Sequence, residues 1–379
     1  MKVKQFLLVI VILLFSFVLV GNSVFAQSEL PQEPPKGETL EATVEKILEE
    51  KQIKPMGSTE MQLYQKLELL VTKGSIKDKK IVIENGNIPV ANNLKYKVDD
   101  RVIVTFSKDF EGTDYFYITD HIRRDSLLWL FLIFVMSAVV IAKWRGILSL
   151  VGMGISFLVI FSFILPKILA GSNPVEIAIL GSLIIIPVSF FLSHGFNKKT
   201  MVAIAGTLIA LIITGVLANI FVEASKLTGF ASEEAGFLQV AKQGTINIKG
   251  LLLAGIIIGV LGVLDDITIS QSAIVFQLKK ANEKLKFNEL YKRAMNVGQD
   301  HISSMVNTLV LVYTGAALPL LLLFIDNPHP FSEIVNYEIV ADEIVRTLVG
   351  SVGLILAVPI TTVIASLLVT QKERKQRTF

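Results

Sequence analysis

The chain has 379 residues, of which 52% are hydrophobic, and its mean hydropathy is +0.61. This composition is typical of a membrane protein and excludes an ordinary soluble domain. The formal net charge is only +3 and there is no cysteine, so disulfides and thiolate metal sites are excluded and nothing indicates a nucleic-acid partner.

The N-terminus has the pattern of a secretory signal. Lys2 and Lys4 precede an apolar run at 6–20, and Val24 and Ala26 place small residues three and one before a cleavage point. Two interpretations remain open: a signal peptide at 1–26 that is cleaved after Ala26, or an uncleaved N-terminal anchor. In both cases the residues that follow lie outside the cytoplasm.

A small extracytoplasmic β-domain is predicted at 38–122, after a Pro- and Glu-rich linker at 27–37. Apolar and polar residues alternate in about five segments, as in half-buried strands, at 40–44, 67–71, 81–83, 102–106 and 116–118. Gly74, Asn85-Gly86 and Gly112 mark turns. This pattern favours a small β-barrel-like domain of oligonucleotide/oligosaccharide-binding (OB) type. The segment has no cluster of aromatic and basic residues, so a spacer or docking module is favoured over a ligand-binding domain.

Seven apolar segments after residue 126 approach the roughly 20 residues needed to cross a hydrocarbon core. They lie near 127–142, 147–165, 175–192, 201–222, 251–264, 305–325 and 347–370. The predicted fold class is therefore a polytopic α-helical membrane bundle of about seven spans, residues 123–371, with a basic cytoplasmic tail at 372–379.

Lys and Arg orient these spans, because cytoplasmic loops carry the excess. If the first span runs inward, 14 of these residues fall in cytoplasmic connections and the tail, and 4 fall in outer connections. The C-terminus is then cytoplasmic and residues 27–122 are extracytoplasmic. Arg123-Arg124 lies outside, and we interpret this pair as the junction between the outer domain and the membrane. Residues 279–304 are predicted to form a cytoplasmic amphipathic helix that contacts anionic lipid headgroups.

The fifth span ends in two adjacent carboxylates, and charge inside a membrane is costly. Small residues share a helical face with Asp266, which predicts close packing and an Asp266 that faces protein. If spans five to seven pack together, they enclose an acid whose protonation couples to helix rearrangement. The candidates for proton or cation coupling are Asp265, Asp266, Thr268, Ser270, Asn307 and Thr308. The predicted packing glycines are Gly255, Gly259, Gly262, Gly315, Gly350 and Gly353.

Two other interpretations fit the acidic pair. Asp265 and Asp266 follow only a short apolar run, so they also fit solvated caps of a new helix that begins at Ile267. They fit polar contacts between helices as well. His301 beside Asp300 fits a surface pair better than a metal or catalytic site. The sequence lacks phosphate-loop, zinc-protease and serine-hydrolase motifs, so we expect no enzyme activity, no metal and no cofactor.

Two blocks carry a resemblance to a known family: Gly262-Val-Leu-Asp-Asp-Ile-Thr-Ile-Ser-Gln271 and Gly298-Gln-Asp-His-Ile-Ser303. With them, residues 125 to 375 resemble the YibE/F family of multi-span bacterial membrane proteins. The resemblance implies a multi-pass plasma-membrane protein of the longer, YibE-like type, without an established biochemical activity. It also implies a YibF-like or other membrane-protein partner; a homo-oligomer is the other expectation.

The order of elements is also similar to that of resistance-nodulation-division permeases and of SecD and SecF. In those proteins the outer domain is followed by a small-residue helix that ends in an acidic pair or an Asn-Asp. An amphipathic helix and a span that opens with Asn-Thr come next. This chain departs from that pattern by two additional spans, 127–165, and a much smaller outer domain. We therefore expect a transporter-like or permease-associated subunit. The alternative is a non-transporting scaffold that displays the outer domain and binds a partner membrane protein.

Overall fold

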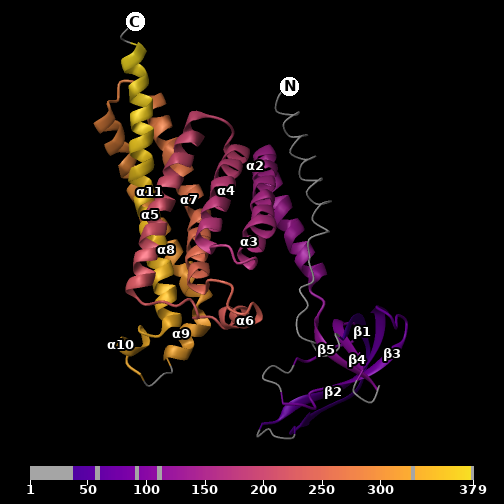
Figure 1. Cartoon of the computed structure of the whole chain (residues 1–379). Coiled ribbons are helices and arrows are strands. Elements are labelled where there is room, and N and C mark those ends of the chain that lie inside the picture. Colours follow the sequence, from indigo (N-terminus) through magenta and orange to yellow (C-terminus); the bar gives the residue numbers. More distant parts are fainter. Residues whose placement is uncertain (1–36, 56–59, 90–93, 109–112, 326–328, 377–379) are drawn as a thin grey trace. The chain divides into compact units, whose positions relative to one another are not determined.

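The computed structural model describes residues 37–55, 60–89, 94–108, 113–325 and 329–376, and the chain divides into two compact units, 1–136 and 137–379. Figure 1 shows the strands of the first unit and the helices of the second. The predicted signal or anchor at 1–26, nearly all of the linker, Gly112 and the last three residues of the tail lie outside the described residues.

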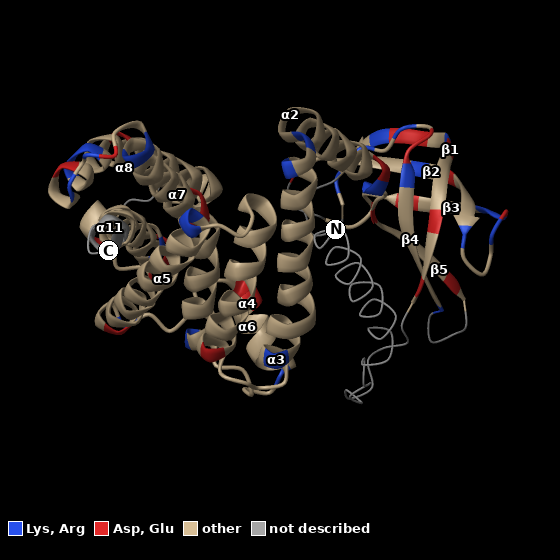
Figure 2. Cartoon of the chain, turned by 90° about the horizontal axis from the view of Figure 1, so that it is seen from above, with Lys and Arg blue, Asp and Glu red and all other residues tan. Residues whose placement is uncertain are grey.

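The first unit contains a five-stranded antiparallel sheet that curves into a half-barrel, in the order β3-β2-β1-β4-β5. The strands are β1 (Glu38–Ile53), β2 (Gln62–Lys73), β3 (Lys80–Asn85), β4 (Arg101–Lys108) and β5 (Asp114–His121). The outermost strands β3 and β5 also approach each other. Charged side chains are spread over these strands (Figure 2). The small β-domain is therefore present, and its assignment to the OB type stays a prediction.

The predicted alternation of apolar residues is confirmed by the core of the sheet. Its fully buried side chains come from the predicted strands, namely Leu40, Ala42, Val44, Leu67, Leu69, Val71, Val102 and Val104. Gly74 and Gly86 have positive φ angles of 127° and 88°, which glycine adopts most easily. They lie at the ends of β2 and β3, where turns were predicted.

One buried polar contact in this unit escaped prediction. The side-chain amide of Gln65, fully buried in β2, donates to the Tyr96 carbonyl oxygen at 2.9 Å and accepts from the Tyr96 N–H at 2.8 Å. Buried backbone groups need such partners. This pair of bonds holds the segment before β4 against the sheet.

Arg123 and Arg124 lie where the sheet leads into helix α2 (Arg124–Val159). The Arg124 guanidinium donates to both carboxylate oxygens of Glu41, at 2.8 and 2.7 Å, and Arg123 pairs with Asp120 at 2.7 Å. A further ion pair joins Arg101 to Asp125. The start of α2 is therefore tied to β1, β4 and the end of β5 within the first unit.

The second unit is helical. After α2 come a π-helical turn (Ile160–Ile164), α3 (Leu165–Leu169), α4 (Pro174–His194), α5 (Lys198–Ala224), α6 (Glu233–Ala241), α7 (Ile248–Ala281), α8 (Phe287–Ala316), α9 (Leu318–Ile325), α10 (Phe331–Ile334) and α11 (Glu338–Gln376). Helices α4, α5, α6 and α7 begin after the side-chain caps Asn173, Asn197, Ser232 and Asn247, each of which accepts a backbone N–H of the first turn.

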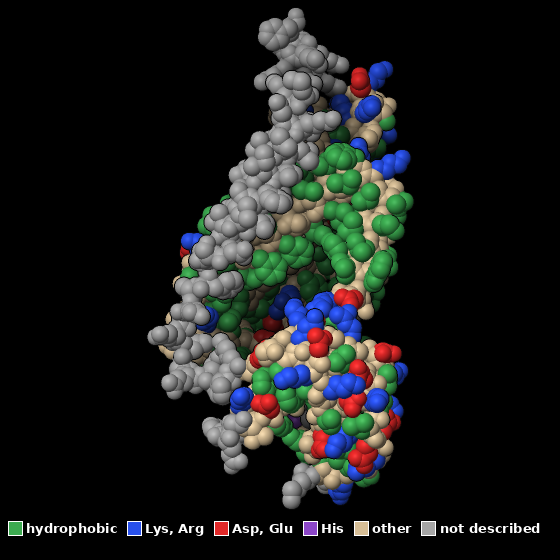
Figure 3. Space-filling model, turned by 90° about the vertical axis from the view of Figure 1, so that its right-hand side faces the viewer, with side chains coloured by type: hydrophobic (Ala, Val, Ile, Leu, Met, Phe, Trp, Pro, Cys, Tyr) green, Lys and Arg blue, Asp and Glu red, His purple; other side chains and the backbone are tan. Residues whose placement is uncertain are grey.

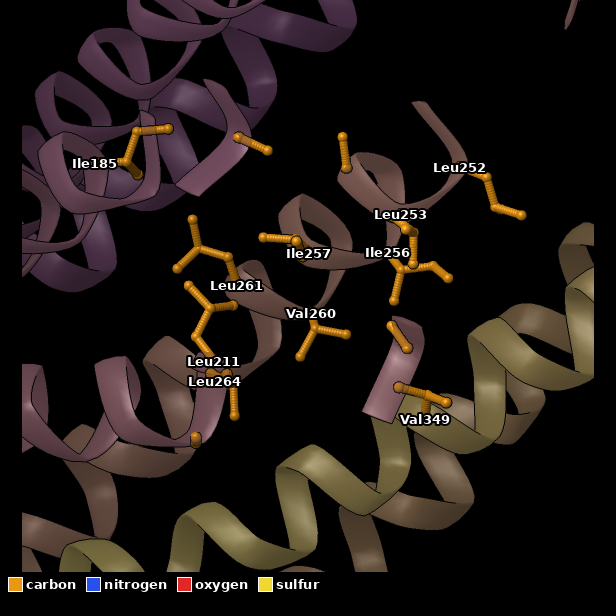
Figure 4. Packing of buried hydrophobic residues seen from close by; sticks show 14 of the residues in the cluster. Ile185, Leu211, Leu252, Leu253, Ile256, Ile257, Val260, Leu261, Leu264 and Val349 are labelled. Carbon is orange, nitrogen blue, oxygen red and sulfur yellow. The ribbon is translucent and has the colours of Figure 1, made fainter. Parts of the chain in front are cut away.

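Helix α7 is the centre of this unit, since it packs against α4, α5, α8 and α11. Figure 4 shows side chains from three neighbours around it: Ile185 of α4, Leu211 of α5 and Val349 of α11. The α7 residues that meet them include Ile257, Val260, Leu261 and Leu264. The core of the unit is therefore organised around one long helix.

The outer surface of the helices is apolar. Large hydrophobic side chains such as Ile141, Ile212 and Leu323 are more than 60% exposed, and Figure 3 shows hydrophobic side chains covering much of the helical unit on the visible face. Charged side chains of this unit gather at helix ends and on α8 (Figure 2). A lipid environment accounts for such a surface, whereas water does not.

Five helices of the described residues are long and apolar enough to cross a membrane, or six if the bent pair α8 and α9 forms one span. The predicted count of seven is therefore not confirmed. Two of the seven predicted spans lie within Arg124–Leu169, which forms a single helical segment of 46 residues. Its backbone leaves helical geometry at Lys143 (φ 52°), and Gly146 lies against the Ala138 carbonyl, so the chain turns back there. This break separates the predicted segments 127–142 and 147–165.

The region 279–325 departs from expectation. In place of an amphipathic helix at 279–304 followed by a span at 305–325, helix α8 runs unbroken from Phe287 to Ala316 and α9 then bends away by 70°. The buried face of α8 includes Leu290, Ala294 and Gly298, and the apolar residues from Met305 onwards follow in the same helix. No helix-breaking residue separates the two parts, which is why one helix forms.

The Arg124–Glu41 pair predicts how the stability of the first unit depends on pH. The hydrogen bonds from Arg124 lower the pKa of Glu41 from 4.5 to about 2. Because the pKa is lower in the folded protein, the stabilisation is complete above about pH 4.5 and is lost as the pH falls towards about 2. We expect wild type to exceed Glu41→Gln in unfolding free energy by about 1 kcal/mol at most near neutral pH.

This difference is measured by urea titration of the full-length chain in detergent, read by pulsed hydrogen exchange of peptides from 38–121. It should shrink between about pH 6 and about pH 3. Asp114→Asn, which removes a wider, exposed pair with Lys108 (3.9 Å), serves as the control. A difference of equal size at both pH values would contradict the role of the ion pair.

Candidate functional site

The acidic pair lies near the middle of α7, which runs continuously from Ile248 to Ala281. No new helix begins at Ile267, so the interpretation of Asp265 and Asp266 as helix caps is wrong. Helix α7 is long because its apolar run continues through buried residues beyond the pair, including Ile267, Ile269 and Val275. Both carboxyl groups are therefore carried by a membrane-spanning helix and not by its end.

Asp265 points into the bundle. Its side chain is half-buried, and its Oδ2 accepts a hydrogen bond from the Ser189 hydroxyl of α4 at 3.2 Å. Gly152 of α2 lies behind Ser189, since a Cβ at this glycine would be 3.6 Å from the Ser189 Cα. Asp265 is thus an acid shared between two membrane helices, and a neutral hydroxyl is its hydrogen-bond partner.

Asp266 lies about 100° of helical rotation away from Asp265. It is exposed together with Gly255, Gly259 and Gly262 on the same face of α7. A Cβ at Gly255 or Gly262 would meet nothing within 4 Å, and one at Gly259 would lie 3.8 Å from the Tyr313 hydroxyl. The prediction that Asp266 faces protein is therefore wrong within this chain. Helical spacing identified the shared face correctly, but not what covers it.

Other predicted glycines do mediate close packing. Gly350 and Gly353 of α11 are buried, and a Cβ at Gly350 would lie 3.2 Å from Val260 of α7. A Cβ at Gly353 would overlap the Thr214 hydroxyl of α5. Gly315 of α8 is exposed and has open space around it. The absence of a side chain therefore lets α11 approach α5 and α7, whereas a Cβ at Gly255, Gly262 or Gly315 would meet no described residue within 4 Å.

Beyond Asp265, the side chains of α7 form a polar core with its neighbours. The Thr268 hydroxyl shares a 2.7 Å hydrogen bond with Thr207 of α5. Gln271 donates to Thr362 of α11 at 2.7 Å and to the Ala294 carbonyl of α8 at 3.1 Å. These side chains are fully buried. Thr268 was a predicted site residue, whereas Gln271 was missed, although a glutamine within a largely apolar helix is a signal that the sequence offers.

The predicted residues of α8 are not brought to the acidic pair. Asn307 and Thr308 are exposed, and the Thr308 hydroxyl donates to the Ser304 carbonyl of its own helix at 3.0 Å. Ser270 is half-buried one turn beyond Asp266. The predicted pocket of Asp265 or Asp266 with Asn307 and Thr308 is therefore not formed within this chain.

A second charged group was overlooked at the start of α11. Asp342 is 7% exposed and accepts a hydrogen bond from Arg346 at 3.0 Å. The predicted span began at Thr347, so both residues were assigned to no segment. An acid and an arginine four residues apart at the head of an apolar run are the signal that could have found them. In the described parts of the chain, no group of His, Asp and Glu is arranged to hold a metal ion.

These features define a helical membrane protein with an N-terminal β-sheet unit and a polar core between its spans. The model of the YibE/F-like protein family matches residues 130–371, more than half of the chain, and the chain therefore belongs to this family. The predicted resemblance is confirmed. No curated protein and no solved structure matches the chain.

The two kinds of glycine predict opposite effects of a methyl group. Gly353→Ala should lower the unfolding temperature, because Thr214 must turn away from a buried hydrogen bond to the Ala210 carbonyl; such overpacking costs about 1–3 kcal/mol. Gly262→Ala should leave it unchanged or raise it, since alanine favours a helix by up to about 1 kcal/mol. Thermal unfolding of both variants in detergent tests this. Equal shifts would contradict the assignment of Gly353 to packing and Gly262 to an open face.

Proposed function

We propose that this chain is a transporter-like or permease-associated subunit of a bacterial plasma membrane, in which Asp265 binds and releases a proton or another cation. The observation that carries the proposal is the position of Asp265. It is a half-buried acid in the middle of α7 whose hydrogen-bond partner, Ser189, belongs to a different helix.

The charge state of such an acid bears on helix packing. A carboxylate in a poorly solvated place needs donors, and Ser189 supplies one uncharged hydroxyl. A protonated carboxyl needs less, so α4 and α7 are free to pack differently in the two states. Binding of a proton or cation at Asp265 would then favour one arrangement of these helices over another.

The polar core restricts which helices can rearrange when the charge of Asp265 changes. Hydrogen bonds from Thr268 and Gln271 join α7 to α5, α8 and α11, whereas α4 contributes the Ser189 bond to Asp265. The contact that senses the charge therefore joins α7 to α4, whereas the other polar bonds of α7 lead to α5, α8 and α11. We infer that α7 and α4 shift against each other, and that the part of α2 that packs on α4 through Gly152 moves with α4.

Infrared difference spectroscopy of the full chain in lipid tests this proposal. A pH change should produce a protonated-carboxyl band that is missing from Asp265→Asn and present in Asp266→Asn, together with amide changes that are lost in the same variant. Ser189→Ala should shift this band, because it removes the hydroxyl partner. A band that persists in Asp265→Asn, or amide changes that are independent of Asp265, would overturn the proposal.

A second candidate function, a scaffold that binds a partner membrane protein, is favoured by one further observation. Asn307 and Thr308 of α8 and Asp266 of α7 are exposed polar groups on membrane helices. Hydrocarbon offers them no hydrogen bonds, and open glycine faces are where membrane helices approach one another. A helix from a partner chain would supply both the packing and the polar contacts.

The partner is testable by cross-linking because the chain has no cysteine. Cysteines introduced as Gly262→Cys and Thr308→Cys should cross-link to a protein in native membranes. Ile212→Cys, on the exposed apolar surface of α5, should not. A product of twice the chain mass identifies a second copy, and any other mass identifies a different partner. Equal labelling at all three positions would contradict a specific partner face.

A further inference from the structure

A cavity of about 420 Å³ lies at the end of the helical unit where α7 and α11 begin. Its walls come from the first turns of these two helices, from the junction of α8 and α9, and from the segment that leads into α6. Most of the lining is small or apolar, including Leu251, Leu320 and Ile339. Three charged side chains of α11, namely Asp342, Glu343 and Arg346, line it as well.

Asp342 is buried in this cavity with half of its carboxylate unused. Its Oδ2 accepts from Arg346 Nη2 at 3.0 Å, whereas its Oδ1 has no hydrogen-bond partner among the described residues. The residue is 7% exposed, so bulk water does not solvate this oxygen freely. An unpaired buried carboxylate oxygen is costly, and a donor from a ligand would remove that cost.

The charges around Asp342 favour a cationic donor. Two carboxylates, Asp342 and Glu343, line the cavity against one guanidinium, that of Arg346. Glu343 Oε1 lies 3.7 Å from the Arg346 Nε, an ion pair without a hydrogen bond, so two acids share the charge of this arginine. A third acid, Glu338, is engaged elsewhere, because it accepts the N–H groups of Thr228 and Gly229 at 2.7 and 2.8 Å. The charged side chains that line the cavity therefore have an excess of negative charge. The bonds of Glu338 also hold the wall segment at Gly229 in place.

The size of the cavity indicates the class of ligand. It is many times larger than the roughly 30 Å³ that one water occupies in the liquid, and its apolar walls suit a carbon body. No trio of His, Asp and Glu in the described chain is arranged for a metal. We propose that this cavity binds a small organic cation, with a protonated amine beside the carboxylates of Asp342 and Glu343, towards which Asp342 turns its buried Oδ1, and with an apolar body against Leu251, Leu320 and Ile339.

This site is separate from Asp265. Gly255 is the last α7 residue of the cavity lining, and Asp265 lies ten residues further along the helix, which is about 15 Å at 1.5 Å per residue. The inference therefore goes beyond the proposed function, and either can fail alone.

The test is calorimetric titration of the full chain in lipid nanodiscs with cyclohexylammonium, with empty nanodiscs as the blank. Wild type should bind this cation saturably, and the neutral analogue cyclohexanol should bind at least tenfold more weakly. Asp342→Asn should weaken cyclohexylammonium binding about tenfold or more, as expected for a lost hydrogen bond to a charged group. Glu234→Gln, which changes an exposed acid of α6 outside the cavity, should bind like wild type.

Leu320→Trp is a second test variant, which keeps the proposal testable if Asp342→Asn does not fold. It places a large side chain in the cavity and leaves Asp342 and Arg346 unsubstituted, and it should abolish binding. The proposal is overturned if wild type shows no saturable binding, which would leave a water-filled cavity. It is also overturned if cyclohexanol binds equally well, or if Asp342→Asn or Leu320→Trp binds cyclohexylammonium like wild type.

Discussion

The helical unit depends on one constraint: a polar group among membrane helices must find its partner on another part of the protein, because hydrocarbon offers none. Helix α7 meets this constraint on three sides. Thr268 bonds to α5 and Gln271 bonds to α8 and α11, while the Ser272 hydroxyl donates to the Lys199 carbonyl at the start of α5 at 2.8 Å. These bonds form only at one relative position of the helices, so they fix the packing that the apolar contacts merely allow.

The proposals on function rest on polar side chains whose hydrogen bonding within the chain is incomplete. Asp265 has one neutral hydroxyl inside the bundle, and Asp266 and Asn307 face outwards. The first is suited to a change of protonation within the chain, and the others to a contact beyond it. The two proposed functions, a transporter-like subunit and a partner-binding scaffold, are therefore compatible, because the proposals rest on different side chains. Asp265 and Asp266 are adjacent in sequence, yet about 100° of helical rotation assigns them to different surroundings.

The sequence predicted what depends on local periodicity. Alternation placed Leu40, Leu67 and Val102 in the sheet core, and the basic stretch at Lys143 marked the place where α2 breaks. It could not predict what depends on neighbours far along the chain. Gln65 is polar in a strand pattern, and only its bonds to Tyr96 account for its burial. Helical spacing likewise grouped the glycines with Asp266, but whether another helix covers that face depends on how α8 leaves the bundle.

Helix α7 links the two proposed sites, Asp265 and the cavity beside Asp342. It is continuous from Ile248 to Ala281, so a tilt or rotation that changes the contact of Asp265 with α4 also moves Gly255 and Leu251 in the wall of the cavity. A cation in the cavity that binds more tightly in one of the two positions of α7 against α4 would then change the affinity of Asp265 for a proton. Linkage makes this effect reciprocal, since the protonation of Asp265 must change the affinity for that cation by the same factor. Coupling of this kind needs no contact between the two acids, only a rigid helix and two arrangements of its neighbours.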